Sequence, residues 1–213
     1  MNSFRRELIN SQIYKNKKKL NGIIADFGGS SKENSRTNVK EIFNKEKIIS
    51  VNIDKSSNAD IISDLENLPI ENNYFDGFLL LEVLEHVQNP NKIIKEIHRV
   101  IKIGSCGFVS MPFLYQIHKA PTDFRRWTKD KLVEFFENSS FDVELITENG
   151  SIYSVIFDLF RSKLMSSNEP KIIKKFKYYI LKLLKPIFKI LDKRNNQASR
   201  HITTGYFLIV RKK

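Results

Sequence analysis

Cysteine is almost absent from this chain of 213 residues, and its single occurrence, Cys106, excludes two kinds of structure. One thiol cannot form an internal disulfide framework, and it cannot supply a zinc site of the CxxC type. Long hydrophobic runs are missing too, because no segment approaches the roughly 18 apolar residues of a membrane-spanning helix. Residues 1–20 are polar and lack the apolar stretch of a secretory signal. These absences favour the reducing cytoplasm, and no metal site is predicted.

Acidic residues are scarce in the last quarter of the chain. Residues 161–213 contain 15 Lys/Arg and 2 Asp/Glu, whereas residues 1–160 contain 21 Lys/Arg and 22 Asp/Glu. The net charge of +12 therefore originates entirely in the last quarter. An evenly basic protein would suggest non-specific nucleic-acid binding. A nearly neutral body with a basic end suggests instead a catalytic domain that docks through that end.

Short apolar runs alternate with helical patterns along the chain. Asn89 and Pro90 suit the start of one helix and Gly104 its end, and Thr128 can cap another. Strands are expected at residues 22–27, 48–53, 60–63, 75–81, 107–111, 141–146 and 204–210. This alternation predicts an α/β fold with a mainly parallel sheet covered on both faces. Ligands bind at the carboxyl ends of such strands, so functional residues should follow them.

Several strand ends carry residues suited to a nucleotide-like ligand. Gly28 and Gly29 follow the first strand, where glycine lets the backbone approach a ligand closely. Asp54 follows the second strand, where a carboxylate can accept hydrogen bonds from both hydroxyls of a ribose. Asp64 and Leu65 could contact an adenine edge. Each feature has a plainer alternative, because the glycines can form a tight turn and Asp54 can cap a helix.

The order of these pieces resembles the class I, Rossmann-like family of S-adenosylmethionine-dependent methyltransferases. The resemblance rests on the segments GIIADFGGSS, VNID and ADIISDLENLPIENNYFDGFLLLEVLEHVQNP, and the stretch from Leu68 to Val87 is its most specific part. It implies a three-layer sandwich with a seven-stranded, mainly parallel sheet whose last two strands are antiparallel. It also implies that S-adenosylmethionine is the cofactor. A nicotinamide-dependent dehydrogenase would carry the GxGxxG motif, which is missing here.

The resemblance also implies which residues contact the cofactor. The residues assigned in this way are Asp26, Phe27, Gly28, Gly29, Asp54, Asp64, Leu65, Leu81 and Glu82. Asp26, Gly28 and Gly29 should lie near the methionine part, Asp54 at the ribose, Asp64 and Leu65 at the adenine, and Leu81 and Glu82 beside the sulfonium. The chain departs from the family in one place, because residues 30–32 stand where a further glycine is usual. This departure leaves open a cofactor-binding scaffold without catalysis.

Residues 111–128 narrow the resemblance. Their sequence MPFLYQIHKAPTDFRRWT resembles the PFLYxxHxxPxDxxRxT segment of bacterial methyltransferases associated with cell-surface glycan synthesis. The segment should lie over the cofactor pocket, where the acceptor enters. His118 is the first candidate for a general base, since an unperturbed pKa of about 6.5 suits proton uptake at neutral pH. Asp123 could orient it, and His86 is a second candidate. All three could instead serve only to hold loops or cap a helix.

The segment between the last two strands is too long for a hairpin turn. It predicts a basic amphipathic helix over residues 170–193, with Pro186 at a kink. Its apolar face consists of Ile172, Ile173, Phe176, Tyr179, Ile180, Leu183, Leu184, Ile187 and Leu191. The helix could pack on the domain with a solvated lysine face, or lie on an anionic membrane. Nucleic-acid binding is disfavoured, because the apolar face is too continuous.

The sequence thus predicts four segments. They are a polar N-terminal segment (1–20), a catalytic core that binds S-adenosylmethionine (21–150), a basic helical insertion (151–200) and a last strand (201–213). The predicted activity is methyl transfer to an oxygen of a glycan or lipid-linked acceptor. The alternatives are a small-molecule or quinone methyltransferase and the scaffold without catalysis. We expect a cytoplasmic protein that binds peripherally to the inner face of the membrane.

Overall fold

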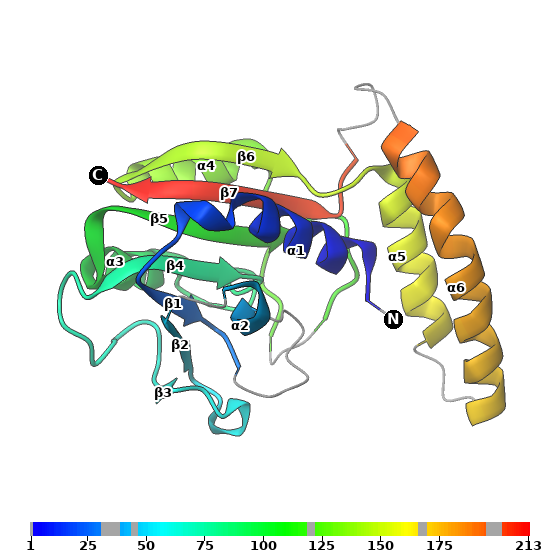
Figure 1. The fold of residues 1–213 in the computed structure, drawn as a ribbon, viewed down its shortest axis with the longest axis horizontal. Coiled ribbons are helices and arrows are strands. Elements are labelled where there is room, and N and C mark those ends of the chain that lie inside the picture. The colour runs from blue at the N-terminus through cyan, green and yellow to red at the C-terminus, as the bar shows by residue number, and fades with distance from the viewer. Residues whose placement is uncertain (1, 31–38, 44–46, 119–121, 166–169, 195–201) are drawn as a thin grey trace.

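The sheet has seven strands in the order β3-β2-β1-β4-β5-β7-β6 (Figure 1). The computed structural model describes residues 2–30, 39–43, 47–118, 122–165, 170–194 and 202–213. The strands are β1 (Ile23–Phe27), β2 (Lys47–Asn52), β3 (Ile61–Ile62), β4 (Phe75–Leu81), β5 (Ile101–Pro112), β6 (Phe141–Glu148) and β7 (Gly205–Lys212). The pairings among β1 to β5 are parallel, and β7 pairs antiparallel with both β5 and β6. The predicted three-layer Rossmann-like fold is confirmed.

Helices cover both faces of this sheet. They are α1 (Phe4–Asn16), α2 (Val39–Ile42), α3 (Pro90–Val100), α4 (Lys129–Asn138), α5 (Ile152–Met165) and α6 (Lys171–Arg194), with short 3-10 turns η1 (Lys17–Lys19) and η2 (Lys55–Ser57). Successive strand residues point to opposite faces. Phe78 of β4 therefore packs with α3 and α4, whereas its neighbour Leu79 packs with α1 and α2. Two apolar cores, one on each side of the sheet, produce the three layers.

Local capping signals explain one helix boundary, and strand pairing explains another. Thr128 caps α4 as predicted, because its hydroxyl accepts a hydrogen bond from the backbone nitrogen of Lys131. Pro90 begins α3 as predicted, but the Asn89 side chain makes no capping hydrogen bond. The prediction that this helix ends at Gly104 was wrong. It ends at Val100, because Ile101 already begins β5 and pairs with β4.

The polar N-terminal segment forms a helix that the sequence analysis did not foresee. Ser3 caps α1 through a hydrogen bond of 3.2 Å from the backbone nitrogen of Arg6. Ile9 and Ile13 lie one turn apart and are fully buried against the sheet. Phe4 packs edge-on against Phe157 of α5. With so few apolar residues, the periodic signal of this helix is weak, and its stability comes from tertiary packing.

Helices α5 and α6 lie side by side and project from one edge of the body, and together they form the arm (Figure 1). A helix therefore does form where the basic amphipathic helix was predicted, with Pro186 inside it. Leu181 of α6 is fully buried against Phe4 and Phe157, with Leu184 and Phe188 packed beside it. Within the part of the chain that the structure describes, no helix has the length and apolar character needed to cross a membrane.

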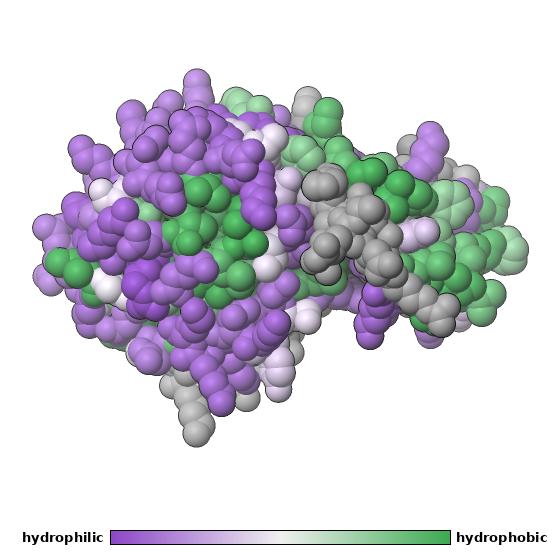
Figure 2. All heavy atoms as spheres, turned by 90° about the horizontal axis from the view of Figure 1, so that it is seen from above, coloured by the Kyte–Doolittle hydropathy of each residue, from purple (hydrophilic) through white to green (hydrophobic). Residues whose placement is uncertain are grey.

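Most of the predicted apolar face of α6, apart from Leu184, does not pack on α5. Ile172, Phe176 and Leu183 expose 77%, 66% and 76% of their surface. Exposed apolar residues also occur on α5, at Ile156 and Phe160. Figure 2 shows hydrophobic residues gathered on the arm, at the right of the view. The helix is thus both packed and amphipathic, because a narrow strip around Leu181 makes the contacts and most of the apolar face remains open.

Candidate functional site

A cavity of about 330 Å³ opens where β1, β2 and β4 end. Four of the predicted cofactor residues line it, namely Gly28, Asp64, Leu65 and Glu82. Asn52 and His86 line it as well. Because the carboxyl ends of neighbouring parallel strands meet at one edge of the sheet, residues far apart in sequence converge here. We call this space the cofactor cavity.

Gly28 occupies a position in the cavity wall where a side chain would be poorly tolerated. Its φ of +80° lies in the left-handed region. A Cβ at this position would also lie only 2.5 Å from Cγ2 of Val83. The side chain of Asn52 donates hydrogen bonds to the carbonyl oxygens of Gly28 (3.0 Å) and Gly29 (2.9 Å), which holds the turn beside β2. Asn52 was missed in the sequence analysis, although its place at the end of a strand was a usable signal.

The other five predicted cofactor residues are not among the described residues that line the cavity. Phe27 and Leu81 pack into the two apolar cores on opposite faces of the sheet. Asp26 and Gly29 flank the turn at Gly28. Asp54 is exposed, and its carboxylate accepts hydrogen bonds of 2.8 Å from both the backbone nitrogen and the hydroxyl of Ser56. In this structure Asp54 therefore caps η2, which was its plainer alternative.

Glu82 closes the floor of the cofactor cavity from the end of β4. Its backbone is left-handed, with φ of 61°, so the chain turns sharply there. The Glu82 carboxylate forms an ion pair with Arg5 of α1 and accepts a hydrogen bond of 3.1 Å from the Ser110 hydroxyl. The N-terminal helix thus reaches the floor of the site, which the sequence analysis did not anticipate.

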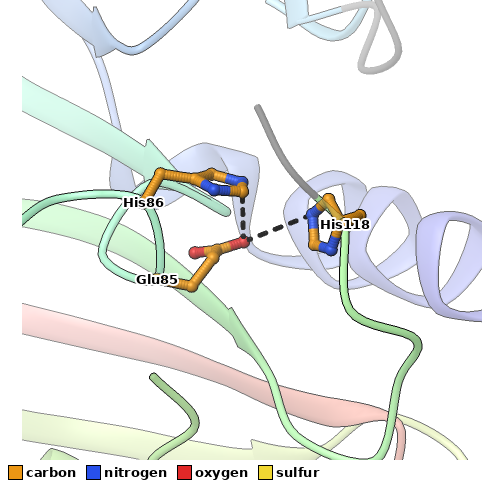
Figure 3. A group of neighbouring side chains, drawn as sticks. All are labelled: Glu85, His86 and His118. Carbon is orange, nitrogen blue, oxygen red and sulfur yellow. Dashed lines mark ion pairs between the residues drawn. The ribbon is translucent and has the colours of Figure 1, made fainter. Parts of the chain in front are cut away.

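Three side chains meet beside this floor. Glu85 and His86 follow β4, and His118 lies in the loop after β5 (Figure 3). The Glu85 Oε1 atom lies 3.6 Å from His86 Nε2 and 4.0 Å from His118 Nε2. The two imidazole rings contact each other edge to face, with centroids 4.9 Å apart. Both predicted histidines are therefore brought together, and Glu85 joins them although no sequence pattern singled it out.

The pKa values of three groups in and around this cluster are shifted from their usual values. Burial, and then the charge of Glu82, raise the pKa of Glu85 to about 8. Burial, and then the charge of Arg5, lower the pKa of His118. Hydrogen bonds from Arg126 hold the pKa of Asp123 at about 2. Asp123 also accepts a hydrogen bond of 3.0 Å from the backbone nitrogen of His118, so it holds the loop that carries this histidine.

A second cavity of about 370 Å³ lies on the other side of His118. Its lining comes from the start of α1, the loop after β5 and α5, and includes Ser3, Arg5, Arg6, Tyr115, His118 and Arg161. The Arg5 guanidinium lies 3.8 Å from the centre of the Tyr115 ring, and Arg161 donates a hydrogen bond of 3.2 Å to the Tyr115 hydroxyl. We call this space the polar cavity. Because His86 lines one cavity and His118 the other, the two cavities meet at this histidine pair.

Arg125 holds together the two loops that carry the histidines. Its guanidinium donates hydrogen bonds to the carbonyl oxygens of Leu84 (3.2 Å), Val87 (2.6 Å) and Gln88 (3.0 Å). The backbone nitrogen of Phe124 donates to the Glu85 carbonyl oxygen at 2.7 Å. The described parts of the motif segment, residues 111–118 and 122–128, therefore lie against the site, and residues 119–121 lie outside the described residues. Arg125 was given no role in the sequence analysis.

Comparison with known proteins bears on this arrangement. Residues 33–109 match the profile of a family described as "Methyltransferase domain". The matched stretch covers about a third of the chain, so it is a resemblance to this family over that stretch. Among curated proteins, an uncharacterized protein of Methanocaldococcus jannaschii is 48% identical over 44 residues. That match spans 21% of this chain and 22% of the relative, so it carries no activity over to the whole protein.

Solved structures share the fold over nearly the whole chain. A S-adenosylmethionine-dependent methyltransferase from Archaeoglobus fulgidus is 16% identical, with a TM-score of 0.61, covering 97% of this chain and 94% of that one. The [4+2]-cyclase SpnF is 16% identical, with a TM-score of 0.65, covering 97% and 81%. Phosphoethanolamine N-methyltransferase 2 from Haemonchus contortus is 13% identical, with a TM-score of 0.60, covering 95% and 52%.

These likenesses establish the fold. A cyclase among them shows that this fold alone does not decide the reaction. The profile match comes from the sequence and is therefore independent of the structural comparison. Together the two support an enzyme that uses S-adenosylmethionine. The expected class I, Rossmann-like fold is confirmed, the comparisons support methyltransferase activity, and the acceptor is a separate question.

Proposed function

We propose that this protein transfers a methyl group from S-adenosylmethionine to a hydroxyl group of a glycan or lipid-linked acceptor. The observation that carries the proposal is the contact between His86, which lines the cofactor cavity, and His118, which lines the polar cavity. When bound, S-adenosylmethionine supplies an activated methyl group on a sulfonium. A donor in one cavity and an acceptor in the other would face each other across the histidine pair, and such positioning supplies much of the rate of a displacement.

The lining of the cofactor cavity suits this donor. The bare backbone of Gly28 leaves room for a ligand where a side chain would collide with Val83. Asp64 and Leu65 are proposed to contact the adenine, and Asp54 the ribose from the rim at the end of β2. The carboxylate of Glu82 is proposed to face the positively charged end of the cofactor, where a negative charge is favourable. Asp26, Phe27, Gly29 and Leu81 would then shape the surrounding backbone.

The polar cavity suits an acceptor rich in oxygen atoms. Arginine side chains bind phosphate and carboxylate groups in a bidentate manner. Arg6 and Arg161 lie in the cavity wall, and both are close to the arm. His118 is the proposed catalytic residue and Asp123 its positioning residue, with His86 beside them. An acidic glycan or the phosphate of a lipid-linked sugar would match this charge.

The arm supports the lipid-linked part of the proposal. Arg161 belongs both to α5 of the arm and to the wall of the polar cavity. On α6, the open apolar face is bordered by exposed lysines that include Lys175 and Lys182. Apolar side chains beside lysines are the combination that places a helix in the interface of an anionic membrane. Docking there, at the inner face of the membrane, would bring the polar cavity close to acceptors anchored in it. A water-soluble small-molecule acceptor would leave this surface without a use.

The test is transfer of labelled methyl groups from S-adenosylmethionine to cell-envelope extracts, analysed by mass spectrometry. We expect the label to appear in a glycan or glycolipid fraction. The labelled methyl group should be released from this fraction only by a treatment that cleaves O-methyl ethers. The Gly28→Val variant is the matched control and should transfer none, because its cofactor cavity is obstructed. Label confined to soluble small molecules would contradict the proposed acceptor class. Absence of cofactor binding by the unaltered protein would contradict the proposed activity itself.

A further inference from the structure

The carboxyl group of Glu85 is in an unusual environment for a buried polar group. The residue is 0% exposed, and neither carboxyl oxygen has a hydrogen-bond partner among the residues that the structure describes. A buried carboxyl group is normally hydrogen-bonded, paired with a charge or bound to a metal. The nearest guanidinium groups are engaged elsewhere, since Arg5 pairs with Glu82 and Arg126 with Asp123. Among the described residues, Glu85 therefore has no hydrogen-bond partner and faces only the two imidazole rings, at 3.6 and 4.0 Å.

The two histidines present lone pairs to this carboxylate. The Nδ1 atom of His86 forms a hydrogen bond with the carbonyl oxygen of Thr122. The Nδ1 atom of His118 lies 3.3 Å from the Gln116 carbonyl oxygen and 3.6 Å from the Asp123 carboxylate. A carbonyl oxygen only accepts, so in each neutral ring Nδ1 carries the hydrogen and Nε2 carries the lone pair. Metal-binding histidines show this same arrangement, in which a carbonyl or carboxylate orients the ring through its second nitrogen.

We propose that Glu85, His86 and His118 bind a divalent transition-metal ion at the junction of the two cavities. The three potential ligand atoms lie within 4.8 Å of one another, and Figure 3 shows both rings directed at one oxygen of Glu85. Two imidazoles and one carboxylate form a recurrent ligand set for zinc and ferrous iron, and the set leaves positions open for other ligands. The separations are wider than bonds of about 2.0–2.2 Å would require, so the side chains must close slightly around an ion.

This inference departs from the expectation drawn from sequence, which was that the protein has no metal site. The ligands come from two loops that are far apart in the chain, so no short motif with metal-ligand spacing exists. Arg125 and the Phe124 backbone nitrogen hold these loops together, which fixes the site before an ion arrives. The site itself does not depend on the proposed function.

The role of the ion does rest on the proposed function. An ion at the junction would take the oxygen of an acceptor hydroxyl as a further ligand, next to the cofactor cavity. Metal binding lowers the pKa of such a hydroxyl, so its proton can pass to water. Neighbouring hydroxyls of a sugar could fill two open positions and fix the acceptor. In this arrangement the Nε2 atom of His118 is used by the metal, so His118 serves as a ligand and not as a general base.

The test measures metal binding by the full chain, without acceptor or cofactor. Metal-free protein is titrated with Co²⁺ and followed by visible absorption, then competed with Zn²⁺ and checked by calorimetry. We expect one bound ion per chain. The Glu85→Gln and His118→Gln variants should each weaken Co²⁺ binding by at least about tenfold, since even second-shell changes reach that size. His98→Gln is the matched control, because His98 lies in α3 and lines neither cavity.

Folding is checked separately for each variant. Glu85→Gln keeps the shape of the side chain and removes a carboxyl group whose raised pKa opposes folding near neutral pH, so its melting temperature should equal or exceed that of the unaltered protein. Unchanged binding of Co²⁺ by Glu85→Gln and His118→Gln, or no binding by the unaltered protein, would overturn the metal site. Failure of the proposed function looks different, because Co²⁺ would then bind as expected while no methyl group is transferred to any extract.

Discussion

The body and the arm of this protein use the same kinds of residue in opposite ways. In the body, large apolar residues such as Phe78 and Phe108 are buried on the two faces of the sheet. In the arm, comparable residues such as Phe176 and Leu183 are exposed. Residues 1–160, which form most of the body, are nearly neutral, whereas the excess positive charge lies in residues 161–213, which include α6 and β7. The difference shows that an apolar stripe in the sequence identifies a surface that is unfavourable in water. It does not show which other surface covers that stripe.

The two regions are joined through the N-terminal helix. The Asp158 carboxylate of α5 accepts hydrogen bonds from the backbone nitrogens of Phe4 (2.8 Å) and Arg5 (3.0 Å). Lys185 of α6 forms an ion pair with Glu7 of α1. Since Arg5 also reaches Glu82 on the floor of the cofactor cavity, one helix connects the arm with the site. The polar cavity lies at this joint, so the arm is placed to influence acceptor binding.

The strongest test of the contrast lies within α6 itself. Leu181 is 0% exposed and Leu183 is 76% exposed, although only one residue separates them. Leu181→Asp should lower the free energy of unfolding by about 3–5 kcal/mol, because it removes core packing and buries a charge. Leu183→Asp should change it by less than about 0.5 kcal/mol, as exposed substitutions do. Urea denaturation measures both. Equal losses would mean that the open face of α6 is covered by protein.

The next largest effect concerns the cofactor cavity and should leave the arm unaffected. Gly28→Val should weaken S-adenosylmethionine binding by at least about 100-fold. Overpacking costs about 1–3 kcal/mol or more, and the strain of a valine at a positive φ adds to this cost. Calorimetry measures the affinity. Gly104→Val is a matched control, since Gly104 has a similar φ of +75° but an added Cβ meets no atom within 4 Å. Its affinity should be unaltered. If both variants lost a comparable amount of S-adenosylmethionine affinity, the cause would be backbone strain and not obstruction of the cofactor cavity.

A moderate effect is expected at the surface of the arm. Lys175→Gln combined with Lys182→Gln should weaken binding to vesicles of acidic lipid by about 2 kcal/mol, roughly 30-fold, at about 1 kcal/mol per lysine. Cosedimentation measures the bound fraction, and raised salt should reduce it because the attraction is screened. Lys47→Gln with Lys55→Gln removes the same charge from exposed positions of the body and should change nothing. Equal binding to neutral vesicles would contradict an electrostatic contribution from the arm.

The smallest effect belongs to the body alone. The Asp76 carboxylate accepts a hydrogen bond of 2.8 Å from the backbone nitrogen of Ile23 and pairs with Lys102 at 2.6 Å, and these contacts lower its pKa. A lowered pKa means stabilisation that is present above the unfolded-state value of about 3.9 and is lost as the pH falls through the folded-state value. Asp76→Asn should therefore cost about 1 kcal/mol of unfolding free energy at pH 7 and less near pH 3. Urea denaturation at both pH values tests this, and a pH-independent loss would contradict it.

Several features were accessible from sequence because their signals are local. Runs such as residues 75–81 match β4 in full, since a strand buried on both faces is apolar throughout. The turn at Gly28 was located because glycine has few substitutes at a positive φ. Asp54 shows the limit of such reasoning, because the same carboxylate suits a ribose or a helix cap. The structure shows the carboxylate capping η2, and its contact with a ribose stays a prediction.

The chain alone thus specified the α/β alternation, the strand ends that form the cofactor cavity and the existence of an amphipathic helix. These depend on the periodicity of side chains and on turn residues, which act over a few positions. Tertiary structure alone decided that α1 packs on the sheet, which strip of α6 meets α5, and that Glu85, His86 and His118 converge. Such contacts join segments distant along the chain. Their energy comes from burying surfaces against each other, and no short stretch of sequence records which surface it will meet.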